Sequence, residues 1–399
     1  MDLSPLWTTL YALAGTLGSY IAFVALLTIP ACQNQVIYLN AVTLTWFKNV
    51  SIPEQWGFLH NQVTPFTLKT PDGETLHAWH ILPLGLYEQH EHELVKEPEG
   101  IAPDITTRLS FRLLRDDPEA LLVLYFHGAA GTLASGFRPP CYRAISAASP
   151  SKIHVVAIDY RGFGSSSGAP SEAGLLTDAL TLASWAADTA GIPPSRIVLF
   201  GQSLGTAVSI SLAHHLALRP TDPVFFKGMV LVAPFADVEL LTATYRVAGT
   251  IPLLSPVARF PRLLALLNKF IKAKWRSREK LAALVRTAEE EGGGGPPSRR
   301  YHIDIMHAED DYDIPWSHSE HLYHAAVDAA RAGGGGVSFE ELDREKGATR
   351  RALGAGGWVA SHETARGVVR EHILKHGLHD VIMSFPVIGL AIARAFRGA

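Results

Sequence analysis

The sequence predicts an α/β fold, a mostly parallel sheet with helices on both faces and a helical cap, preceded by an N-terminal transmembrane helix. Three features predict it: a charge-free apolar segment at the N-terminus, short apolar runs alternating with helical patterns, and a long insertion that interrupts this alternation. Hydrophobic residues make up 47% and charged residues 18%, which is typical of folded domains. Lys and Arg number 35 against 38 Asp and Glu, which argues against a chain that coats nucleic acid. Only Cys32 and Cys141 are present, which excludes a disulfide scaffold.

Residues 1–30 are expected to form an uncleaved, single-pass membrane anchor. No Asp, Glu, Lys or Arg occurs in residues 3–47, and Leu6–Ile29 is almost entirely apolar. A helix of about 20 apolar residues can cross a bilayer while satisfying its own backbone hydrogen bonds. A signal peptide, which would need a positive start where Asp2 stands, and a buried core helix are the alternatives.

Residues 31–60 are predicted to be a juxtamembrane linker. The nearest base after the anchor is Lys48, so the sequence leaves the membrane face of the following domain open. The aromatic residues of this segment either lie at the membrane interface or pack on the folded domain; they are Trp46, Phe47, Trp56 and Phe58.

Residues 61–399 are predicted to form the α/β domain. It begins with an antiparallel hairpin, Val63–Lys69 and Thr75–Leu82, around a Thr-Pro-Asp-Gly turn, and residues 85–118 are interpreted as a loop. Helical patterns at Ser171–Ala190 and Leu204–Leu218 then alternate with apolar runs that predict parallel strands. These runs are Leu121–Phe126, Ile153–Ile158, Arg196–Phe200, Gly228–Ala233 and Tyr301–His307. In such sheets, ligand sites lie at the carboxyl ends of the strands.

Residues 235–300 are predicted to be a cap inserted over the sheet. Three prolines break an apolar run there, and Lys269–Lys280 is rich in Lys and Arg. This basic stretch is either a solvated surface or a contact for anionic lipid headgroups. Gly292–Gly295 and Gly333–Gly336 are interpreted as surface insertions.

Ser203 is the candidate nucleophile. A predicted strand runs directly into Gly201-Gln202-Ser203-Leu204-Gly205, and an apolar helix follows. This strand–turn–helix context is what a nucleophile elbow requires, because the sharp turn exposes the serine oxygen above the sheet.

A serine hydroxyl needs a base, and the base needs an orienting acid; in this arrangement the acid precedes the histidine in the chain. Asp311 is the predicted acid, because it stands at D-x-x-I-P spacing after the last predicted parallel strand; Asp310 and Asp313 are the alternatives. His379 is the predicted base, in a loop between a predicted helix over Glu363–Lys375 and a final helix from about Pro386.

Two histidine questions stay open in the sequence. His362, in a Gly-rich loop, is the alternative base. His372, His376 and His379 have a spacing that metal ligands also show, but no fourth strong ligand is near, so no metal is expected.

The oxyanion hole is predicted to use two backbone N–H groups, those of Leu204 and Ala129. Leu204 follows the nucleophile, and Ala129 lies in the loop after an early strand. His127, in the same loop, is expected to shape it by donating a hydrogen bond.

Motifs in this order resemble the α/β-hydrolase superfamily over roughly residues 60–395; they are His127-Gly128-Ala129-Ala130-Gly131-Thr132, Asp159-Tyr160-Arg161-Gly162-Phe163-Gly164-Ser165-Ser166, Gly168-Ala169-Pro170-Ser171-Glu172, Gly201-Gln202-Ser203-Leu204-Gly205 and His307-Ala308-Glu309-Asp310-Asp311. Within it, they are similar to the membrane-anchored branch that contains the monoacylglycerol and lysophosphatidylserine lipases. That resemblance implies a single transmembrane helix and an endoplasmic-reticulum membrane. The oxyanion loop of the branch usually reads H-G-N-A-G, and Ala129 replaces the Asn, a change that keeps the backbone donor.

The expected activity is therefore hydrolysis of the carboxylic ester of a monoacylglycerol or lysophospholipid by a membrane-anchored serine hydrolase, through an acyl-enzyme and without a cofactor. The expected partners are a lipid substrate and a membrane, not nucleic acid. A protein-depalmitoylating thioesterase and a non-catalytic binding protein with a hydrolase fold are the alternatives. Acyl-chain length, headgroup and oligomeric state stay open.

Overall fold

The computed structural model describes residues 4–247, 249–252, 254–290, 300–331 and 335–398. Its main sheet has ten strands in the order β1-β2-β4-β3-β5-β6-β9-β12-β11-β10. Strands β3, β4, β5, β6, β9 and β12 are parallel to their neighbours within this group, whereas both edges of the sheet are antiparallel. The strands are β1 (Val63–Lys69), β2 (Thr75–Ile81), β3 (Leu121–Phe126), β4 (Ile153–Ile158), β5 (Ile197–Gln202), β6 (Gly228–Val232), β9 (Tyr301–Ala308), β10 (Arg351–Ala352), β11 (Gly357–Glu363) and β12 (Gly367–Leu374).

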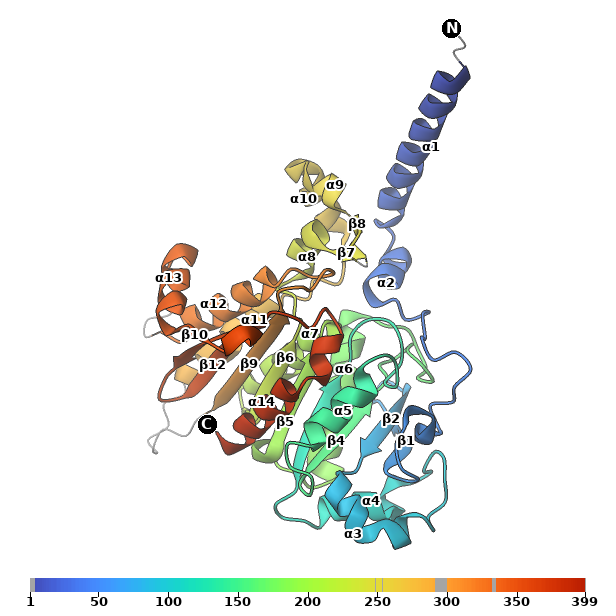
Figure 1. Ribbon diagram of the computed structural model, residues 1–399, viewed down its shortest axis with the longest axis vertical. Coiled ribbons are helices and arrows are strands. Elements are labelled where there is room, and N and C mark those ends of the chain that lie inside the picture. Colours follow the sequence, from blue (N-terminus) through green and yellow to red (C-terminus); the bar gives the residue numbers. More distant parts are fainter. Residues whose placement is uncertain (1–3, 248, 253, 291–299, 332–334, 399) are drawn as a thin grey trace.

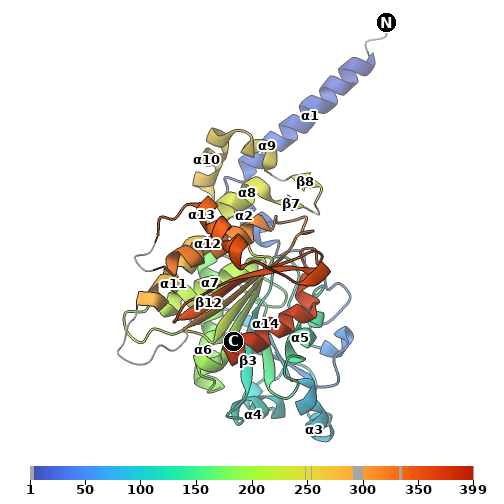
Figure 2. The ribbon, with the colours of Figure 1, turned by 60° about the vertical axis from the view of Figure 1, so that its left-hand side comes forward.

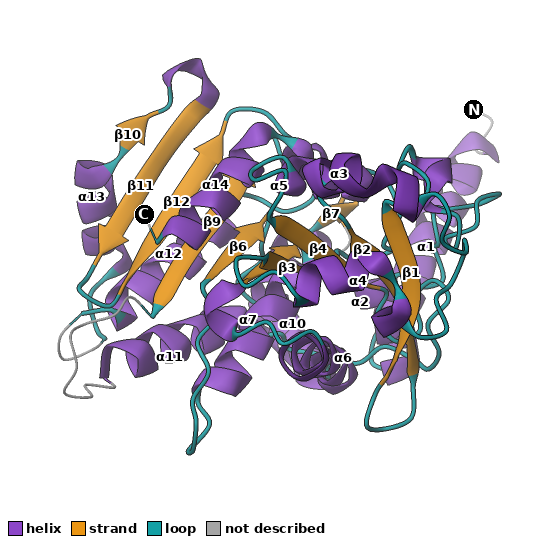
Figure 3. Ribbon diagram, turned by 90° about the horizontal axis from the view of Figure 1, so that it is seen from below, coloured by secondary structure: helices purple, strands orange, loops and turns teal. Residues whose placement is uncertain are grey.

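Helices cover both faces of this sheet, as the sequence predicted (Figures 1 and 3). One face is covered by α6 (Glu172–Ser184, continued by a π-helical turn over Trp185–Thr189), α7 (Leu204–Ala217), α11 (Ser277–Glu290), α12 (Ser317–Ala329) and α13 (Phe339–Thr349). The other face is covered by α5 (Arg138–Ser146) and α14 (Pro386–Arg397). Buried apolar side chains form a separate core on each side of the sheet, so the central strands are buried on both faces.

Three predictions from the sequence are wrong. Residues 85–118 are not a loop, because α3 (Leu84–Leu94) and α4 (Leu109–Arg115) lie within them and bury apolar side chains together. The helix predicted over 363–375 is instead strand β12, and His362 lies on strand β11 rather than in a loop. β12 lies between β9 and β11 and pairs with both, so its β-branched residues are buried on both faces of the sheet. Such an environment favours a strand.

The insertion after β6 contributes a small layer at the carboxyl end of the strands (Figures 1 and 2). It contains α8 (Val238–Thr244), a ribbon of β7 (Arg246–Val247) and β8 (Ile251–Pro252), α9 (Ser255–Ala258) and α10 (Pro261–Phe270). The next helix, α11, packs on α7 and α12, so the predicted cap region also includes a helix that covers the sheet. Gly292–Gly295, Gly333 and Gly334 lie outside the described residues.

Helix α1 (Ser4–Leu26) projects away from the domain (Figure 1). Its residues Trp7–Leu26 form the one described helix that is long and apolar enough to cross a membrane, judged by length and composition. Helix α2 (Pro30–Tyr38) follows, and its end buries Tyr38 in the domain core, so the predicted linker is in part a packed helix.

The join between α1 and the insertion is made by one buried glutamine. Gln33 Nε2 donates to the carbonyl oxygens of Leu27 (2.7 Å) and Phe270 (2.8 Å), and its Oε1 accepts the N–H of Lys272 (3.1 Å). Leu27 packs in a small cluster with apolar residues of α9 and α10. The base of α1 is therefore fixed to the insertion by side-chain packing and hydrogen bonds.

The four aromatic residues after the anchor differ in whether they pack on the domain. Phe58 is buried and Trp56 is half-buried, and both pack edge-on against Trp79. Trp46 and Phe47, in contrast, are exposed. The remaining short helical turns are of the 3₁₀ type, at Pro53–Trp56, Ile105–Thr107, Pro194–Arg196, Gly354–Gly356 and Val381–Ser384.

Candidate active site

Ser203 lies in a strained turn between β5 and α7. Its φ of 51° and ψ of −117° are unusual for a residue with a side chain. The turn is held because the N–H of Ser203 donates to Val232 O (3.0 Å) and Thr206 Oγ1 donates to Ser203 O (2.7 Å). This geometry is that of a nucleophile elbow, which keeps the serine oxygen clear of its own strand.

The glycines of the motif are required by close packing of the backbone. A Cβ at Gly205 would overlap the carbonyl of Phe126 at the end of β3, and a Cβ at Gly201 would overlap the carbonyl of Gly205. The tight approach of α7 to β3 and β5 therefore explains why glycine is present at both positions.

Asp311 lies in the turn after β9 and is buried. Its Oδ1 accepts the N–H groups of Asp313 (2.9 Å) and Ile314 (3.0 Å), which is the physical meaning of the D-x-x-I-P spacing. Its Oδ2 lies 3.0 Å from Nε2 of His307. Burial alone would raise the pKa of Asp311, but His379 and hydrogen bonds from both histidines outweigh burial and hold it well below its usual range.

His379 lies in the loop after β12 and contacts this carboxylate. Its Nδ1 is 2.8 Å from Asp311 Oδ2. Burial alone would lower the pKa of His379, but the charge of Asp311 and the hydrogen bond to it raise that pKa to about 9. The carboxylates of Asp380 and Asp313 contribute in the same direction.

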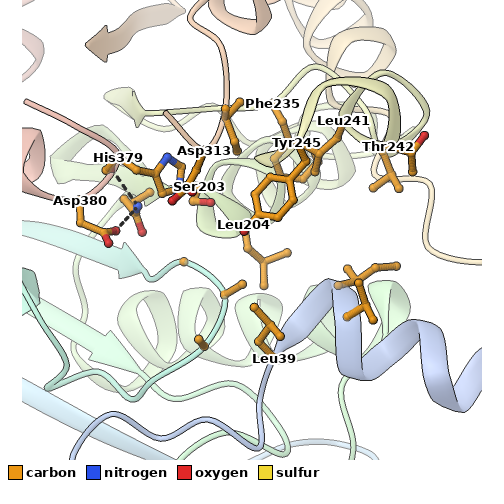
Figure 4. Close-up of a pocket in the computed structure, with 18 of the residues that line it drawn as sticks. Leu39, Ser203, Leu204, Phe235, Leu241, Thr242, Tyr245, Asp313, His379 and Asp380 are labelled. Atoms are coloured by element: carbon orange, nitrogen blue, oxygen red, sulfur yellow. Dashed lines mark hydrogen bonds between the residues drawn. The ribbon is translucent and has the colours of Figure 1, made fainter. Parts of the chain in front are cut away.

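The structure brings Ser203 and His379 into the same pocket (Figure 4). Asp311 lies behind His379, so the three predicted residues are assembled from the ends of β5, β9 and β12. These ends meet at the carboxyl edge of the parallel strands, where sites in this class of sheet form.

The alternative residues lie elsewhere or make other contacts. His362 lies on β11, outside the lining of this pocket. Asp310 Oδ1 accepts the N–H of Leu378 (2.8 Å) and so holds the loop that carries the histidine. Asp313 lines the pocket but does not replace Asp311 as the partner of His379.

The two N–H groups predicted for the oxyanion hole, those of Ala129 and Leu204, both belong to residues that line the pocket. Within the described residues, neither N–H has a hydrogen-bond acceptor. The next two N–H groups of the loop do have acceptors. The N–H of Ala130 donates to Tyr38 O (2.9 Å), and the N–H of Gly131 donates to Val42 O (2.5 Å). The loop is thus held by the segment after α2 while Ala129 is left available.

Sequence reasoning missed Arg138, which organises this loop. Its buried guanidinium donates through Nη2 to the carbonyls of Gly128 (3.1 Å), Ala129 (3.2 Å) and Ala130 (2.9 Å). Because Arg138 binds these three carbonyl oxygens on one side of the loop, the N–H groups of the loop face the other side. His127 Nδ1 also donates to Gly128 O (2.7 Å), in agreement with its predicted loop-shaping role.

Gln202 was also missed, although it lies inside the serine motif. Its Nε2 donates to Asp380 Oδ1 (3.0 Å) and approaches the carbonyl of His379 (3.4 Å). The residue before the nucleophile therefore ties the elbow to the histidine loop, a contact between residues that are far apart in sequence.

The pocket is mainly apolar and has a volume of about 290 Å³. Leu241 and Tyr245 of the insertion lie across the pocket from Leu39 of the N-terminal segment (Figure 4). Leu27 and Leu267, which pack in one apolar cluster, also line it. An apolar ligand bound there would contact both the base of α1 and the residues at the end of β5.

Within the described residues, no cluster of three or more His, Cys, Asp or Glu side chains could hold a metal ion. The three histidines with metal-like spacing point to different places: His372 Nε2 contacts buried Asp304 (2.8 Å), His376 is exposed, and His379 lies in the pocket.

Comparisons with known proteins agree with this fold. A family model described as the alpha/beta hydrolase family matches residues 120–350. The lysophosphatidylserine lipase ABHD12 of Danio rerio is 30% identical over 59% of this chain and 55% of its own length, and that of Xenopus tropicalis is 32% identical over 56% and 52%. The chain thus spans about half the length of the curated relatives it matches. The crystal structure of an alpha-beta hydrolase from Vibrio vulnificus has the same fold, with a TM-score of 0.50 at 16% identity over 79% of this chain and 89% of that one.

Proposed function

This chain belongs to the alpha/beta hydrolase family, and we propose on that basis that it is a membrane-tethered serine hydrolase that cleaves the ester of a lysophospholipid or a monoacylglycerol. The observation that carries the proposal is the pocket, because Ser203 and His379 share it with Leu27 at the base of the candidate membrane span. The lipase names of the relatives support a lipid ester as the substrate.

In the proposed reaction, Ser203 Oγ attacks the acyl carbon while His379 Nε2 takes its proton. Asp311 accepts the Nδ1–H and stabilises the imidazolium that forms, and the N–H groups of Ala129 and Leu204 hold the oxyanion. His379 returns the proton to the departing alcohol, which leaves an acyl ester on Ser203. A water molecule, deprotonated by the same imidazole, then releases the fatty acid.

The size of the pocket favours a lipid with one acyl chain. Its volume of about 290 Å³ is just below the usual range for small-molecule sites, which starts at about 300 Å³. A single chain can lie along the apolar wall, whereas a second chain would have no comparable cavity within the described residues that line the site.

We further propose that the substrate enters from the bilayer. Helix α10 turns Phe260, Leu263, Leu266 and Phe270 towards solvent, beside the base of α1. The charged residues within α10 and just before it are basic, Arg262, Lys269 and Arg259, which suits a helix at an anionic lipid surface. An endoplasmic-reticulum location and a single span, with 1–30 as anchor and 61–399 as the hydrolase domain, remain part of this proposal.

The test is hydrolysis of lysophosphatidylserine and monoacylglycerol in mixed micelles, read by mass spectrometry, together with labelling by a fluorophosphonate probe. Wild type should release fatty acid and take up the probe, and Ser203→Ala should do neither. Ser184→Ala, which changes an exposed serine at the end of α6, is the matched control. Equal labelling of wild type and Ser203→Ala would remove the proposed nucleophile, and faster cleavage of a palmitoyl-thioester peptide than of either lipid would favour the thioesterase alternative.

A further inference from the structure

Four arginines line a second pocket, of about 280 Å³, on the side of the sheet that carries α14. Arg351 comes from β10, Arg370 from β12, and Arg394 and Arg397 from the last turn of α14. We call it the four-arginine pocket. It shares no lining residue with the pocket that contains Ser203.

Strand register explains why these side chains converge. Ser361 of β11 pairs with Arg370, and Val359, two residues earlier on the same face, pairs with Arg351. Residues that pair directly across strands point to the same face of a sheet, so both arginines lie on one face. Arg394 and Arg397, three residues apart, lie on one side of α14 and close the pocket from above.

This corner of the sheet is open. Helix α14 packs on β5, β6 and β9, whereas α12 and α13 pack on the opposite face of β12 and β11 (Figure 2). An α/β sheet usually buries both faces under helices, with apolar residues towards them. Here the uncovered part of the face carries cationic side chains in place of apolar ones.

The positive charge is only partly balanced by the protein. No Asp or Glu is among the described residues that line the pocket. Arg370 forms a salt bridge with Glu363 at 3.7 Å, and its Nη1 lies 3.1 Å from His302 Nε2. Within the described chain, Arg351, Arg394 and Arg397 take part in no salt bridge. By contrast, Arg161 elsewhere on the domain is neutralised by Asp72 and Asp178.

We propose that the four-arginine pocket binds a small phosphate-bearing anion with more than one negative charge. Several guanidinium groups around one cavity offer paired N–H donors, which match the oxygens of phosphate better than those of a monovalent anion. Bound anion would also relieve the repulsion among the four cations. The C-terminal end of α14 lies well away from α1 in Figures 1 and 2, which favours a dissolved anion over a lipid headgroup. The site does not depend on the proposed hydrolase activity.

The experiment is calorimetric titration of the full-length chain in detergent with inorganic pyrophosphate at constant ionic strength. Wild type is expected to bind with a dissociation constant of about 0.1 mM or lower, since several charge-assisted hydrogen bonds contribute. The double variant Arg394→Gln/Arg397→Gln should bind at least about tenfold more weakly, because one such bond contributes about that factor.

The matched control is Arg112→Gln/Arg115→Gln, which removes two arginines from the last turn of α4 and should leave binding unchanged. Arg351→Gln, on an exposed edge strand, is the second test variant if the α14 variant loses thermal stability. An absence of binding to wild type at about 10 mM pyrophosphate, weaker than a specific site would give, would overturn the proposal. An equal loss in both double variants would also overturn it, because net charge would then explain the effect. Flotation on phosphatidic-acid vesicles that needs Arg394 and Arg397, without pyrophosphate binding, would assign the site to a lipid headgroup instead.

Discussion

Replacing Asp311 with asparagine should disable the proposed base by reversing its hydrogen bonding. The carboxylate accepts two backbone N–H groups of its own turn through Oδ1 and contacts His379 Nδ1 through Oδ2. An asparagine has one carbonyl oxygen, which the two backbone donors retain. Its NH₂ group then faces Nδ1, so His379 must accept there and carry its proton on Nε2, the atom that should accept from Ser203.

The expected loss is large, because two effects act together. The pKa of His379 is about 9, against an ordinary value of 6.5. That difference corresponds to about 3.4 kcal/mol, or roughly 300-fold, of preferential stabilisation of the imidazolium by its surroundings. The wrong tautomer adds to it, so we expect kcat/KM to fall by about 10³–10⁴.

The pH profile gives a second, independent readout. His379 must lose its proton before it can act as a base, so wild-type kcat/KM should rise as pH increases through about 9. In Asp311→Asn the supporting charge is gone and the pKa of His379 falls, so the rise should move to lower pH while the plateau drops.

The assay is hydrolysis of a soluble short-chain ester, measured across pH for wild type, Asp311→Asn and Asp310→Asn. Asp310→Asn is the control, because Asp310 accepts the N–H of Leu378 and does not contact His379. If Asp311→Asn stays within about tenfold of wild type, less than the cost of losing an orienting acid, Asp311 does not orient the base. A pH rise that stays near 9 in that variant would refute the electrostatic part of the argument.

Three further outcomes follow from the same geometry. Asp380→Asn removes a carboxylate that raises the pKa of His379, so the rise in kcat/KM should move to lower pH, by less than in Asp311→Asn and with little loss of plateau rate, as a pH-rate profile would show. Gly205→Ala places a Cβ on a backbone carbonyl, so the free energy of unfolding should fall by about 3 kcal/mol or more, measured by denaturant titration. Leu263→Ser/Leu266→Ser reduces the apolar face of α10. The KM for a lysophospholipid in vesicles should therefore rise several-fold, since about 1.4 kcal/mol of lost binding free energy is worth a factor of ten. Hydrolysis of a soluble ester should not change.

The α10 variant has an internal comparison. Leu218→Ser changes an exposed leucine outside both the pocket and α10, so its KM for vesicle substrate should match that of wild type. Equal effects on soluble and vesicle substrates in the α10 variant would point to damage of the pocket instead of lost membrane contact.

The parts of the site that depend on local chain geometry could be predicted from the sequence. The turn at Ser203 follows from a strand, two glycines and a helix in succession, and the family membership supports that interpretation. Asp311 could be ranked above its neighbours because its spacing from Ile314 reflects hydrogen bonds made within four residues.

The parts that depend on tertiary contacts could not be predicted. The sequence predicts His379 as the base but leaves His362 open as an alternative in a Gly-rich loop, because only the pairing of β11 with β12 shows that His362 lies on a strand. The segment between them was predicted to be a helix, and its pairing with β9 and β11 makes it a strand. Arg138 and Gln33 gave no signal, since their partners are carbonyl oxygens that the fold brings to them.

The hydrogen bonds of Gln33 have a mechanical consequence. The Gln33 side chain is hydrogen-bonded both at the base of α1 and at the end of α10, so the two helices cannot rotate independently of each other. If α1 spans a bilayer as proposed, the domain would keep one tilt relative to the membrane, and the opening of the pocket would face the lipids from a constant direction. Shortened chains meant for solution work should therefore keep Leu27, because removing it takes away one of the two carbonyl acceptors of the buried Gln33 amide and leaves only that of Phe270.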